Sequence, residues 1–245
     1  MTICILNTRP AHQATRLTQL IEARGYEVFH LPLIEIVPLI FSPIDLTLFD
    51  YIIFTSVNAV NYFFSQHEFK NVEQANYIAI GPATQQALID ALQCAATVLC
   101  PETFTSNGIL LMPELQSIYH QSILIVSGDN PKPLLKNELK KRGARAQMIF
   151  CYQRKLIAYN MQAVFPELQK ANIQLIICTS NEMLSHLMRL FTVHPDWLHE
   201  KTLCVAHFDI KARAISEGFH NVILAENATD EAMVAALQLV GYDRA

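Results

Sequence analysis

The sequence predicts an α/β protein built on parallel sheets, and three observations lead to this prediction. Short apolar runs recur along the 245 residues, and amphipathic stretches of helical period separate them. The runs are continuous rather than alternating, which is typical of parallel strands covered on both faces. Gly25, Gly143 and Gly218 each follow a helical stretch and precede an apolar run, as expected where a left-handed residue ends a helix.

The expected elements alternate in type along the chain, which is the signature of α/β layers. The apolar runs predict strands at residues 3–6, 28–31, 51–54, 77–80, 97–99, 123–126, 147–150, 175–178, 203–206 and 222–224. The amphipathic stretches predict helices at residues 11–24, 57–66, 83–93, 106–116, 132–142, 181–191, 209–217 and 229–240. The stretch around His194 and His199 is expected to be a loop.

Composition excludes several classes of protein. Hydrophobic residues make up 51% of the chain and charged residues 16%, so the chain can bury a core and is not disordered. The 18 Lys+Arg against 22 Asp+Glu give a formal charge of −4, which disfavours a polybasic nucleic-acid binder. No apolar run is long enough to span a bilayer, and no signal peptide is visible, so we expect a cytoplasmic protein with neither a membrane nor a nucleic-acid partner.

The cysteines and histidines show no spacing that is typical of metal ligands, so no metal site is expected. The six cysteines form no CxxC pair, and most lie in strand-like runs. We interpret them as reduced core residues; a disulfide framework or a zinc site is the alternative.

The chain also repeats itself. Residues 49–56 (FDYIIFTS) resemble residues 173–180 (IQLIICTS), which places Thr55 and Thr179 124 residues apart. Thr105 and Thr229 each open a helical stretch and are also 124 residues apart. Gly25 and Gly143, which end corresponding segments, are separated by 118. Three ordered matches at nearly one offset indicate a duplicated domain.

The order of the repeated pieces allows two arrangements. If the opening strand–helix–strand piece is A and the next three-strand piece is B, the chain runs A, B, A, B. Adjacent A and B pieces can share a sheet, or the middle B and A can form one domain and the outer A and B the other. We favour the second arrangement, because segments 31–39 and 151–155 then become two crossing linkers that can pair as a hinge. It gives a discontinuous first domain (1–34 and 156–245), an inserted second domain (40–150), and linkers 35–39 and 151–155.

Candidate binding residues follow the strands, because open α/β sheets bind ligands beyond the carboxyl ends of their strands. These positions are rich in hydroxyl and amide groups. The candidates are Arg9, Thr55, Ser56, Asn58, Gly81, Pro82, Thr84, Ser106, Ser127, Gly128, Thr179, Ser180 and Asn181. They include no pair of catalytic carboxylates, no phosphate loop, no dinucleotide fingerprint and no nucleophile elbow. Such an ensemble on two lobes suits a large, polar, anionic ligand held by many weak contacts.

Each candidate also has a structural interpretation. Ser, Thr and Asn after a strand are ordinary helix N-caps, which contribute about 1 kcal/mol each, and a capped helix start can still bind an anion. Arg9 follows a strand directly and is a candidate anion ligand. Tyr152 lies in a linker, where its phenol can donate a proton to a leaving group or simply pack. His207 can cap or pack. The basic stretch is a solvated helix face or a steering patch; it comprises Lys136, Lys140, Lys141, Arg142 and Arg145.

A set of short segments, taken in order, resembles the uroporphyrinogen-III synthase family over essentially the whole chain. No single segment is specific, but their order and spacing are. They are NTRP at 7–10, LPLIEI at 31–36, FTSVNAV at 54–60, AIGPAT at 79–84, FTSNG at 104–108, CYQR at 151–154 and ATDEA at 228–232.

The resemblance implies two flavodoxin-like three-layer domains joined by a two-stranded linker, with the second domain inserted into the first. It implies a cyclising lyase of porphyrin and haem biosynthesis, which converts linear hydroxymethylbilane to uroporphyrinogen III with loss of water and inversion of the D ring, and which needs no cofactor. By similarity, Thr84 and Tyr152 match positions that line the site, and Tyr152 is the candidate for assisting loss of the hydroxyl group.

One segment departs from the family's pattern. Where the first domain often carries a Gly-Pro-Thr-Thr-like turn, this chain reads AHFDI at 206–210, so the hydroxyl contact expected near Ile210 is missing. The expected partner is the small-molecule linear tetrapyrrole, with a transient contact to the preceding bilane-forming enzyme also considered, and the expected state is a monomer. The alternatives are a non-catalytic two-lobed binding or regulatory protein, and a nucleotide- or flavin-binding relative, which would require a phosphate loop.

Overall fold

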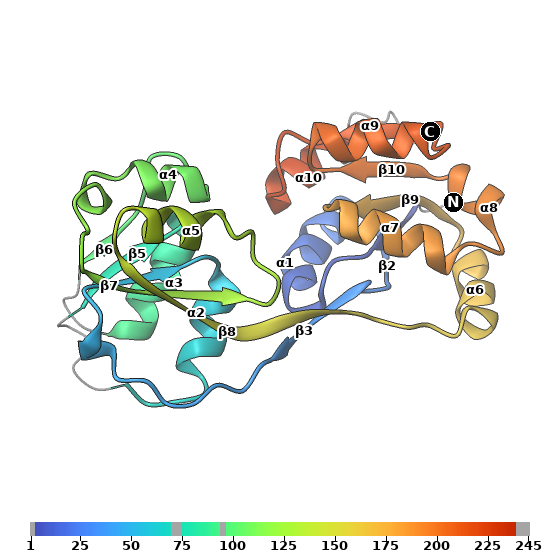
Figure 1. Cartoon of the computed structure of the whole chain (residues 1–245). Coiled ribbons are helices and arrows are strands. Elements are labelled where there is room, and N and C mark those ends of the chain that lie inside the picture. Colours follow the sequence, from blue (N-terminus) through green and yellow to red (C-terminus); the bar gives the residue numbers. More distant parts are fainter. Residues whose placement is uncertain (1–2, 70–74, 94–96, 239–245) are drawn as a thin grey trace. The chain divides into compact units, whose positions relative to one another are not determined.

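A computed structural model describes residues 3–69, 75–93 and 97–238 of the chain. The fold divides into two compact units (Figure 1). Unit 1 combines residues 1–35 with residues 155–245, and unit 2 comprises residues 36–154. Each unit is built around its own sheet, so each is described by itself.

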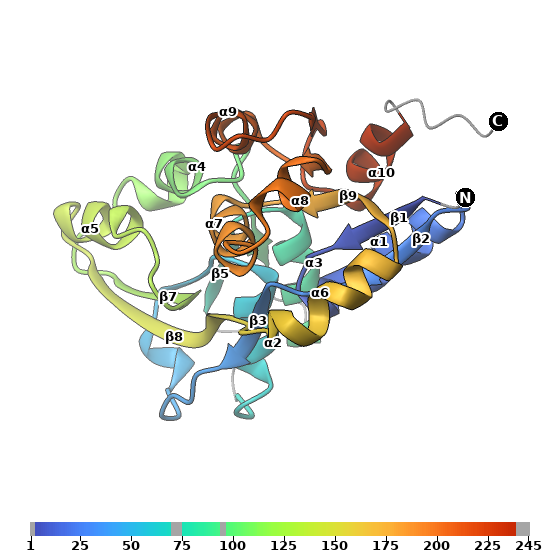
Figure 2. The ribbon, with the colours of Figure 1, turned by 90° about the vertical axis from the view of Figure 1, so that its right-hand side faces the viewer.

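Unit 1 contains a parallel sheet of five strands in the order β11-β10-β9-β1-β2. Its strands are β1 (Cys4–Asn7), β2 (Glu27–His30), β9 (Ile173–Cys178), β10 (Thr202–Val205) and β11 (Val222–Leu224). Its helices are α1 (Ala11–Glu22), α6 (Met161–Lys170), α7 (Asn181–Leu190), α8 (Pro195–His199), α9 (Phe208–Ser216) and α10 (Asp230–Gln238). Leu17 and Ile21 of α1 share a core with Met233 and Val234 of α10, whereas α7 and α9 pack together on the other face of the sheet (Figure 2).

Unit 2 contains a sheet of six strands in the order β3-β8-β7-β4-β5-β6. Its strands are β3 (Ile34–Pro38), β4 (Tyr51–Phe54), β5 (Asn76–Ala79), β6 (Val98–Leu99), β7 (Ser122–Gly128) and β8 (Arg145–Leu156). Its helices are η1 (Leu46–Leu48), α2 (Val57–Phe64), α3 (Pro82–Leu92), α4 (Ser106–Leu111), η3 (Pro113–Leu115) and α5 (Leu134–Lys141). Ile52 faces a core under α2 and α3, and the next residue, Ile53, faces a core under α4 and α5, so helices cover both faces.

The strand orders describe how the repeated pieces share the two sheets. The outer pieces share the sheet of unit 1 and the middle pieces share the sheet of unit 2. If the five parallel strands of each unit are numbered with piece A before piece B, both units have the strand order 2-1-3-4-5, which is the flavodoxin-like order. In unit 2, piece B comes before piece A along the chain. The α/β class with parallel sheets, predicted from the sequence, is confirmed.

The two segments by which the chain passes between the units pair with each other. The amide of Leu39 donates to the carbonyl of Cys151 (3.0 Å), and the amide of Ile157 donates to the carbonyl of Leu33 (3.0 Å). Residue 33 pairs with residue 157 and residue 39 with residue 151, so residue numbers rise along one strand as they fall along the other. β3 and β8 are therefore antiparallel. The two segments are thus neighbouring strands.

Three helix predictions were wrong in detail. The helix predicted over 106–116 ends at Leu111, because Met112 precedes Pro113 and adopts an extended ψ of 137° that avoids a clash with the proline ring. α6 was not predicted, because Pro166 interrupts the helical pattern of the sequence, although the helix itself continues through it. The stretch expected as a loop forms the short helix α8, with Pro195 in its first turn, where a proline costs no hydrogen bond.

Smaller predictions were tested as well. Gly25, Gly143 and Gly218 have φ of 81°, 85° and 99°, as expected of residues that end helices. Cys4, Cys100, Cys151, Cys178 and Cys204 are free thiols, and all but Cys100 are buried. Cys94 and the last two residues of the helix predicted over 229–240 lie outside the described residues. None of the described helices is long and apolar enough to cross a membrane.

Candidate functional site

A cavity of about 370 Å³ opens at the carboxyl ends of the strands of unit 2. It lies where β4 and β7 end, beside β8, the start of α4 and the loop that leads to α5. Its lining includes six residues that the sequence singled out, namely Thr55, Ser56, Ser106, Ser127, Gly128 and Tyr152. The topology therefore brings together side chains that are up to 97 residues apart in the sequence.

Four of the hydroxyl groups of this cavity are joined in two pairs. The Thr55 hydroxyl donates to the hydroxyl oxygen of Ser127 (3.0 Å), and the Oγ of Ser56 lies 3.0 Å from the phenol oxygen of Tyr152. Ser56 is also the N-cap of α2, since its Oγ accepts the amide proton of Ala59 (3.1 Å). The capping and site interpretations of Ser56 are thus compatible, because one lone pair caps the helix while the hydroxyl faces Tyr152.

Two cations on the cavity wall were missed by the sequence analysis. Lys132 and Arg154 line the cavity and are exposed, and neither forms an ion pair with any described residue. Lys132 lies in the loop before α5, between two prolines, and Arg154 follows Tyr152 by two residues on β8. The segment CYQR at 151–154 contains Arg154. The sequence analysis used this segment to establish the resemblance and did not consider the charge of its arginine.

The remaining candidates of unit 2 lie outside this cavity. Asn58 is half-buried in the first turn of α2, and Gly81 is the N-cap of α3. Pro82 begins α3 and is exposed, whereas Thr84 in the same turn is only 4% exposed. Gly81 and Thr84 are therefore the buried members of this set, and the role of all four in binding stays a prediction.

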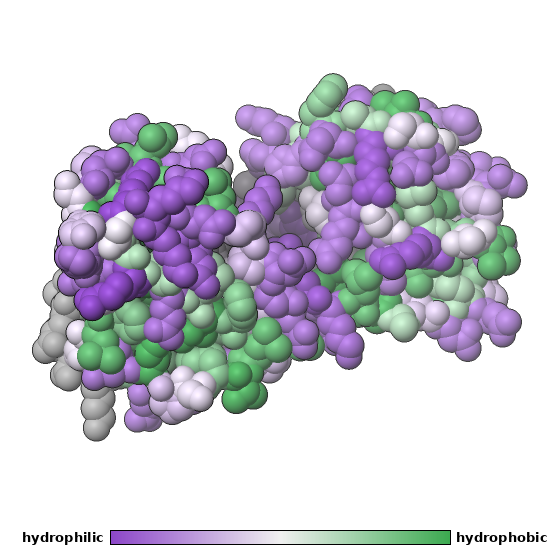
Figure 3. All heavy atoms as spheres, in the orientation of Figure 1, coloured by the Kyte–Doolittle hydropathy of each residue, from purple (hydrophilic) through white to green (hydrophobic). Residues whose placement is uncertain are grey.

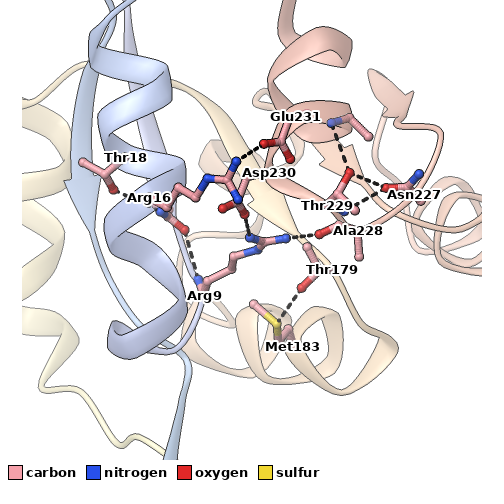
Figure 4. A network of polar contacts seen from close by, with 12 residues as sticks. Arg9, Arg16, Thr18, Thr179, Met183, Asn227, Ala228, Thr229, Asp230 and Glu231 are labelled. Atoms are coloured by element: carbon pink, nitrogen blue, oxygen red, sulfur yellow. Dashed lines mark hydrogen bonds and ion pairs between the residues drawn. The ribbon is translucent and has the colours of Figure 1, made fainter. Parts of the chain in front are cut away.

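The corresponding edge of unit 1 is organised around an ion-paired arginine (Figure 4). The guanidinium of Arg9 contacts the carboxylate of Asp230 and donates to the carbonyl of Ala228. The Arg9 side chain is 8% exposed and that of Asp230 is 16% exposed. The fixed cation that the sequence predicted at this edge is present, but a carboxylate already neutralises it.

The same contacts hold the start of α10. Thr229 caps this helix by accepting the amide proton of Ala232 (3.3 Å), and the side chain of Asn227 accepts from the amide of Thr229 (2.9 Å). On the exposed side, Arg16 of α1 pairs with Glu231. Figure 4 shows Arg9, which precedes α1, and Arg16, which lies within α1, both reaching toward the beginning of α10. The motif ATDEA at 228–232 is therefore a helix start clamped by two cations.

A shallow pocket of about 400 Å³ lies beside this network. Its lining residues are Arg9, His12, Gln13, Arg16, Thr179, Ala228 and Asp230. Two of the predicted candidates, Arg9 and Thr179, thus come together. Ser180 is the N-cap of α7 and accepts from the amide of Met183 (3.2 Å), and Asn181 donates to Asp209 (3.3 Å).

The departure from the family's pattern has a structural counterpart. His207 is the residue before α9 and is exposed, and it makes no side-chain capping bond. Ile210 is buried in the first turn of the same helix. A hydrophobic side chain therefore occupies the place where a hydroxyl contact was expected.

The basic stretch of α5 separates into structural and exposed members. Arg142 donates to the carbonyls of Leu110 (2.7 Å) and Leu115 (2.9 Å), so it ties down the turn after α4. Lys141 pairs with Glu138 (2.6 Å), and Lys140 and Arg145 are exposed. Figure 3 shows hydrophilic side chains over α5. Among the described residues, no group of three His, Cys, Asp or Glu side chains is placed to hold a metal ion.

The thiols near these strand ends are held in the neutral form. Burial raises the pKa of Cys151 in unit 2 to about 12. It raises the pKa of Cys178 and of Cys204 in unit 1 to about 12 as well. Since the thiolate is the reactive form, these cysteines supply no nucleophile at neutral pH.

Parallel sheets of flavodoxin-like order, with hydroxyl groups and helix starts at their strand ends, define an α/β protein of the ligand-binding kind. The model of the family described as "Uroporphyrinogen-III synthase HemD" matches residues 15–235. The chain belongs to the uroporphyrinogen-III synthase family, a family of enzymes of haem biosynthesis.

Individual relatives agree with this membership. The chain is 29% identical to the uroporphyrinogen-III synthase of Escherichia coli (strain K12), over 96% of this chain and 99% of that protein. Two solved structures share its fold with a TM-score of 0.62 each. One is uroporphyrinogen-III synthetase from Helicobacter pylori 26695 (21% identity, covering 98% of this chain and 100% of the other). The other is a variant of uroporphyrinogen III synthase from the extremely thermophilic bacterium Thermus thermophilus (16% identity, 97% and 100%).

Proposed function

We propose that this chain cyclises hydroxymethylbilane to uroporphyrinogen III, with inversion of the D ring and loss of water. Membership of the family over residues 15–235 carries the proposal. The cavity in unit 2 supports it, because the cavity combines a phenol, several hydroxyls and two cations that pair with no described carboxylate. A flavin or nucleotide site is disfavoured because the sequence has no phosphate loop.

The proposed chemistry needs little from the protein besides position. A pyrrole nitrogen of the substrate supplies the electron pair that expels the terminal hydroxyl group, and the departing oxygen takes up a proton to leave as water. The resulting azafulvene is attacked by a carbon of the D ring, and a spiro-pyrrolenine then rearranges to the inverted product. Holding the bilane so that this carbon attacks is a problem of orientation, for which effective molarities are large. No cofactor enters these steps.

We assign the proton for the leaving water to Tyr152. Its phenol lies in the cavity, 3.0 Å from the Oγ of Ser56, and a bound substrate can replace or share that contact. Because the Oγ of Ser56 keeps its bond to the Ala59 amide, it stays fixed when the phenol donates to another oxygen. Tyr152 is thus a proton donor that a second hydroxyl holds in place.

The acetate and propionate groups of the bilane are the proposed ligands of the remaining residues. In unit 2, Lys132 and Arg154 supply charge, and the other contacts come from hydroxyl groups and helix starts, which bind anions through their amides. These are Thr55, Ser56, Asn58, Gly81, Pro82, Thr84, Ser106, Ser127 and Gly128. In unit 1 we assign contacts to Thr179, Ser180 and Asn181. Arg9 stays paired with Asp230 and holds the edge on which these residues lie. We further infer that the chain acts as a cytoplasmic monomer, with at most a transient contact to the enzyme that forms the bilane.

The test is an isomer assay. The full chain is supplied with freshly generated hydroxymethylbilane, the products are oxidised, and uroporphyrins I and III are resolved. We expect isomer III, whereas isomer I alone, as in the uncatalysed control, would favour the non-catalytic binding protein. In the same assay Tyr152→Phe should lower kcat several-fold without abolishing it, because one proton donor is lost and positioning is kept. Tyr51→Phe is the control: it removes a hydroxyl at the opposite end of β4 and should leave kcat unchanged. If Tyr152→Phe has the same kcat as the unmodified chain, Tyr152 takes no part in the mechanism.

A further inference from the structure

An irregularity in β8 decides where Tyr152 lies. β7 and β8 pair in register from Ser122 opposite Arg145 to Ser127 opposite Phe150. The next pair is Gly128 opposite Tyr152, so Cys151 is an extra residue without a partner on β7. Such bulges re-aim side chains and are common beside active sites. Without the bulge, Gly128 would be opposite Cys151, and Tyr152 would be opposite the residue that follows Gly128.

The thiol of Cys151 fills the space on the inner side of this bulge. It is fully buried and lies 3.4 Å from the carbonyl oxygen of Ala59 and 3.4 Å from that of Ser127. The bulge therefore sends Cys151 into the core and leaves Tyr152 beside the end of β7. The carbonyl of Tyr152 accepts the amide proton of Asp129 (2.8 Å), which fixes the backbone on the far side of the bulge.

Tyr152 then lies directly against Gly128, where there is no room for a side chain. A Cβ at Gly128 would lie 2.6 Å from the Cζ atom of Tyr152 and 3.0 Å from its hydroxyl oxygen. Carbon atoms in contact prefer about 3.5–4.0 Å, so any other residue at this position must displace the phenol end of the ring. Gly128 has no positive φ, so its need for glycine comes from this contact and not from backbone conformation.

Two further groups hold the ring on its other sides. The ring of Tyr62 on α2 stacks with that of Tyr152, with centroids 5.9 Å apart and planes inclined by 29°. The Oγ of Ser56 lies 3.0 Å from the phenol oxygen. Tyr152 is 5% exposed in this position, so its ring is enclosed and only a small part reaches the cavity.

We propose that Gly128 is a positioning residue, whose missing side chain forms the slot that presents the Tyr152 hydroxyl to the substrate. Besides the contact with substrate that is proposed above for Gly128, the geometry points to an action through Tyr152. The inference rests on the proposed function, because it assumes that the phenol takes part in the reaction. It predicts that a methyl group at position 128 moves the hydroxyl away from Ser56 and acts on turnover only through that movement.

The experiment is a double-mutant cycle of Gly128→Ala and Tyr152→Phe in the full chain, with kcat, KM and the isomer ratio measured for all four proteins. Gly128→Ala alone should lower kcat several-fold, as Tyr152→Phe does, and change KM less than kcat. In the Tyr152→Phe background it should leave kcat unchanged, because the hydroxyl that it displaces is already gone. The melting temperature should fall by a similar amount in both backgrounds, since the phenylalanine ring keeps the contact with the added methyl group.

Two outcomes would overturn the inference: a Gly128→Ala protein with unchanged kcat, and losses in kcat that multiply in the double variant. Failure of the proposed function looks different, because the unmodified chain would then yield isomer I alone. Cys151→Ala is the matched control: it keeps the backbone bulge, removes only the thiol on its inner side and adds no atom beside Tyr152, so it should lower stability and leave kcat unchanged. If Gly128→Ala does not fold, Gly128→Ala/Tyr152→Leu removes the clashing ring and should fold as well as Tyr152→Leu; an unfolded double variant would contradict the contact.

Discussion

The strand-end edges of the two units share their local construction and differ in their charges. In both, a Thr-Ser pair follows the strand that begins piece B: Thr55 and Ser56 after β4, and Thr179 and Ser180 after β9. Both serines cap the next helix with the same bond, from the amide three residues on, at 3.1 Å and 3.2 Å. The capping geometry has therefore been kept in the two copies of the fold.

The cations of the two edges are used differently. In unit 1, Arg9 is buried and neutralised by Asp230, and Arg16 is paired with Glu231. In unit 2, Lys132 and Arg154 line the cavity together with one carboxylate, that of Asp129, which forms an ion pair with neither. A buried, compensated cation mainly organises the fold, whereas an exposed, uncompensated one is available to an anionic ligand. We therefore expect charge removal to affect stability in unit 1 and substrate binding in unit 2.

Arg9→Ala should have the largest effect on stability. It leaves the carboxylate of Asp230 largely buried without its partner and frees the carbonyl of Ala228, so the free energy of unfolding should fall by about 3 kcal/mol. Urea unfolding of the full chain, followed by far-UV circular dichroism, measures this change. Arg16→Ala removes the exposed pair of the same network and should cost less than about 1 kcal/mol.

A second comparison sharpens the role of Arg9. Arg9→Ala/Asp230→Ala removes both charges and should be more stable than Arg9→Ala alone, since no carboxylate then remains unpaired. If Arg9→Ala instead keeps full stability and raises KM many-fold, Arg9 binds substrate directly and the contrast between the edges is wrong.

The buried thiols give a pH-dependent effect that also differs between the units and that is smaller, for each pH unit, than the effect of Arg9→Ala. A thiol with a raised pKa in the folded state stays protonated while the unfolded chain ionises, so its contribution is complete below the ordinary pKa of 9.0 and is lost as pH rises toward about 12. Each such thiol should lower the free energy of unfolding by about 1.4 kcal/mol per pH unit in that range.

Variants assign this pH dependence to the units. Cys151→Ala should reduce the alkaline slope by one proton in unit 2, and Cys178→Ala/Cys204→Ala should reduce it by two in unit 1. Urea unfolding at a series of alkaline pH values gives the slopes. An unchanged slope in Cys178→Ala/Cys204→Ala would show that these thiols ionise in the folded protein.

The fold could be predicted from the sequence because its signals are local. Continuous apolar runs gave the strands, and the glycines that end helices gave the boundaries, both of which depend on neighbouring residues. α6 was missed because Pro166 weakens the helical pattern, although Asn160 supplies its N-cap by accepting from the amide of Gln162 (3.2 Å). Tertiary packing, which buries Phe165 and Leu168, outweighs the proline.

The site was predictable in part for the same reason. The strand-end rule located the hydroxyl groups of the cavity, since it needs only the end of each strand. The state of Arg9 could not be predicted, because its partner Asp230 lies 221 residues away and only the fold brings them together. The slot of Tyr152 depends on a one-residue bulge, which leaves no pattern in the sequence of β8.

The cations of unit 2 give the last prediction and the smallest expected energy. Lys132→Ala and Arg154→Ala should each raise KM for hydroxymethylbilane about 5-fold, or about 1 kcal/mol, because each removes one exposed charge from an anionic ligand. The effect should shrink at high salt, where such charges are screened. Steady-state assays at two ionic strengths measure it, and Lys170→Ala, an exposed lysine on α6 of unit 1, is the matched control. Lys132→Ala and Arg154→Ala should both keep the stability of the unmodified chain, whereas Arg9→Ala is expected to lose stability. If KM stays constant in Lys132→Ala and Arg154→Ala, the carboxylates of the bilane bind through amides and hydroxyls alone, and the uncompensated charge of unit 2 has no part in recognition.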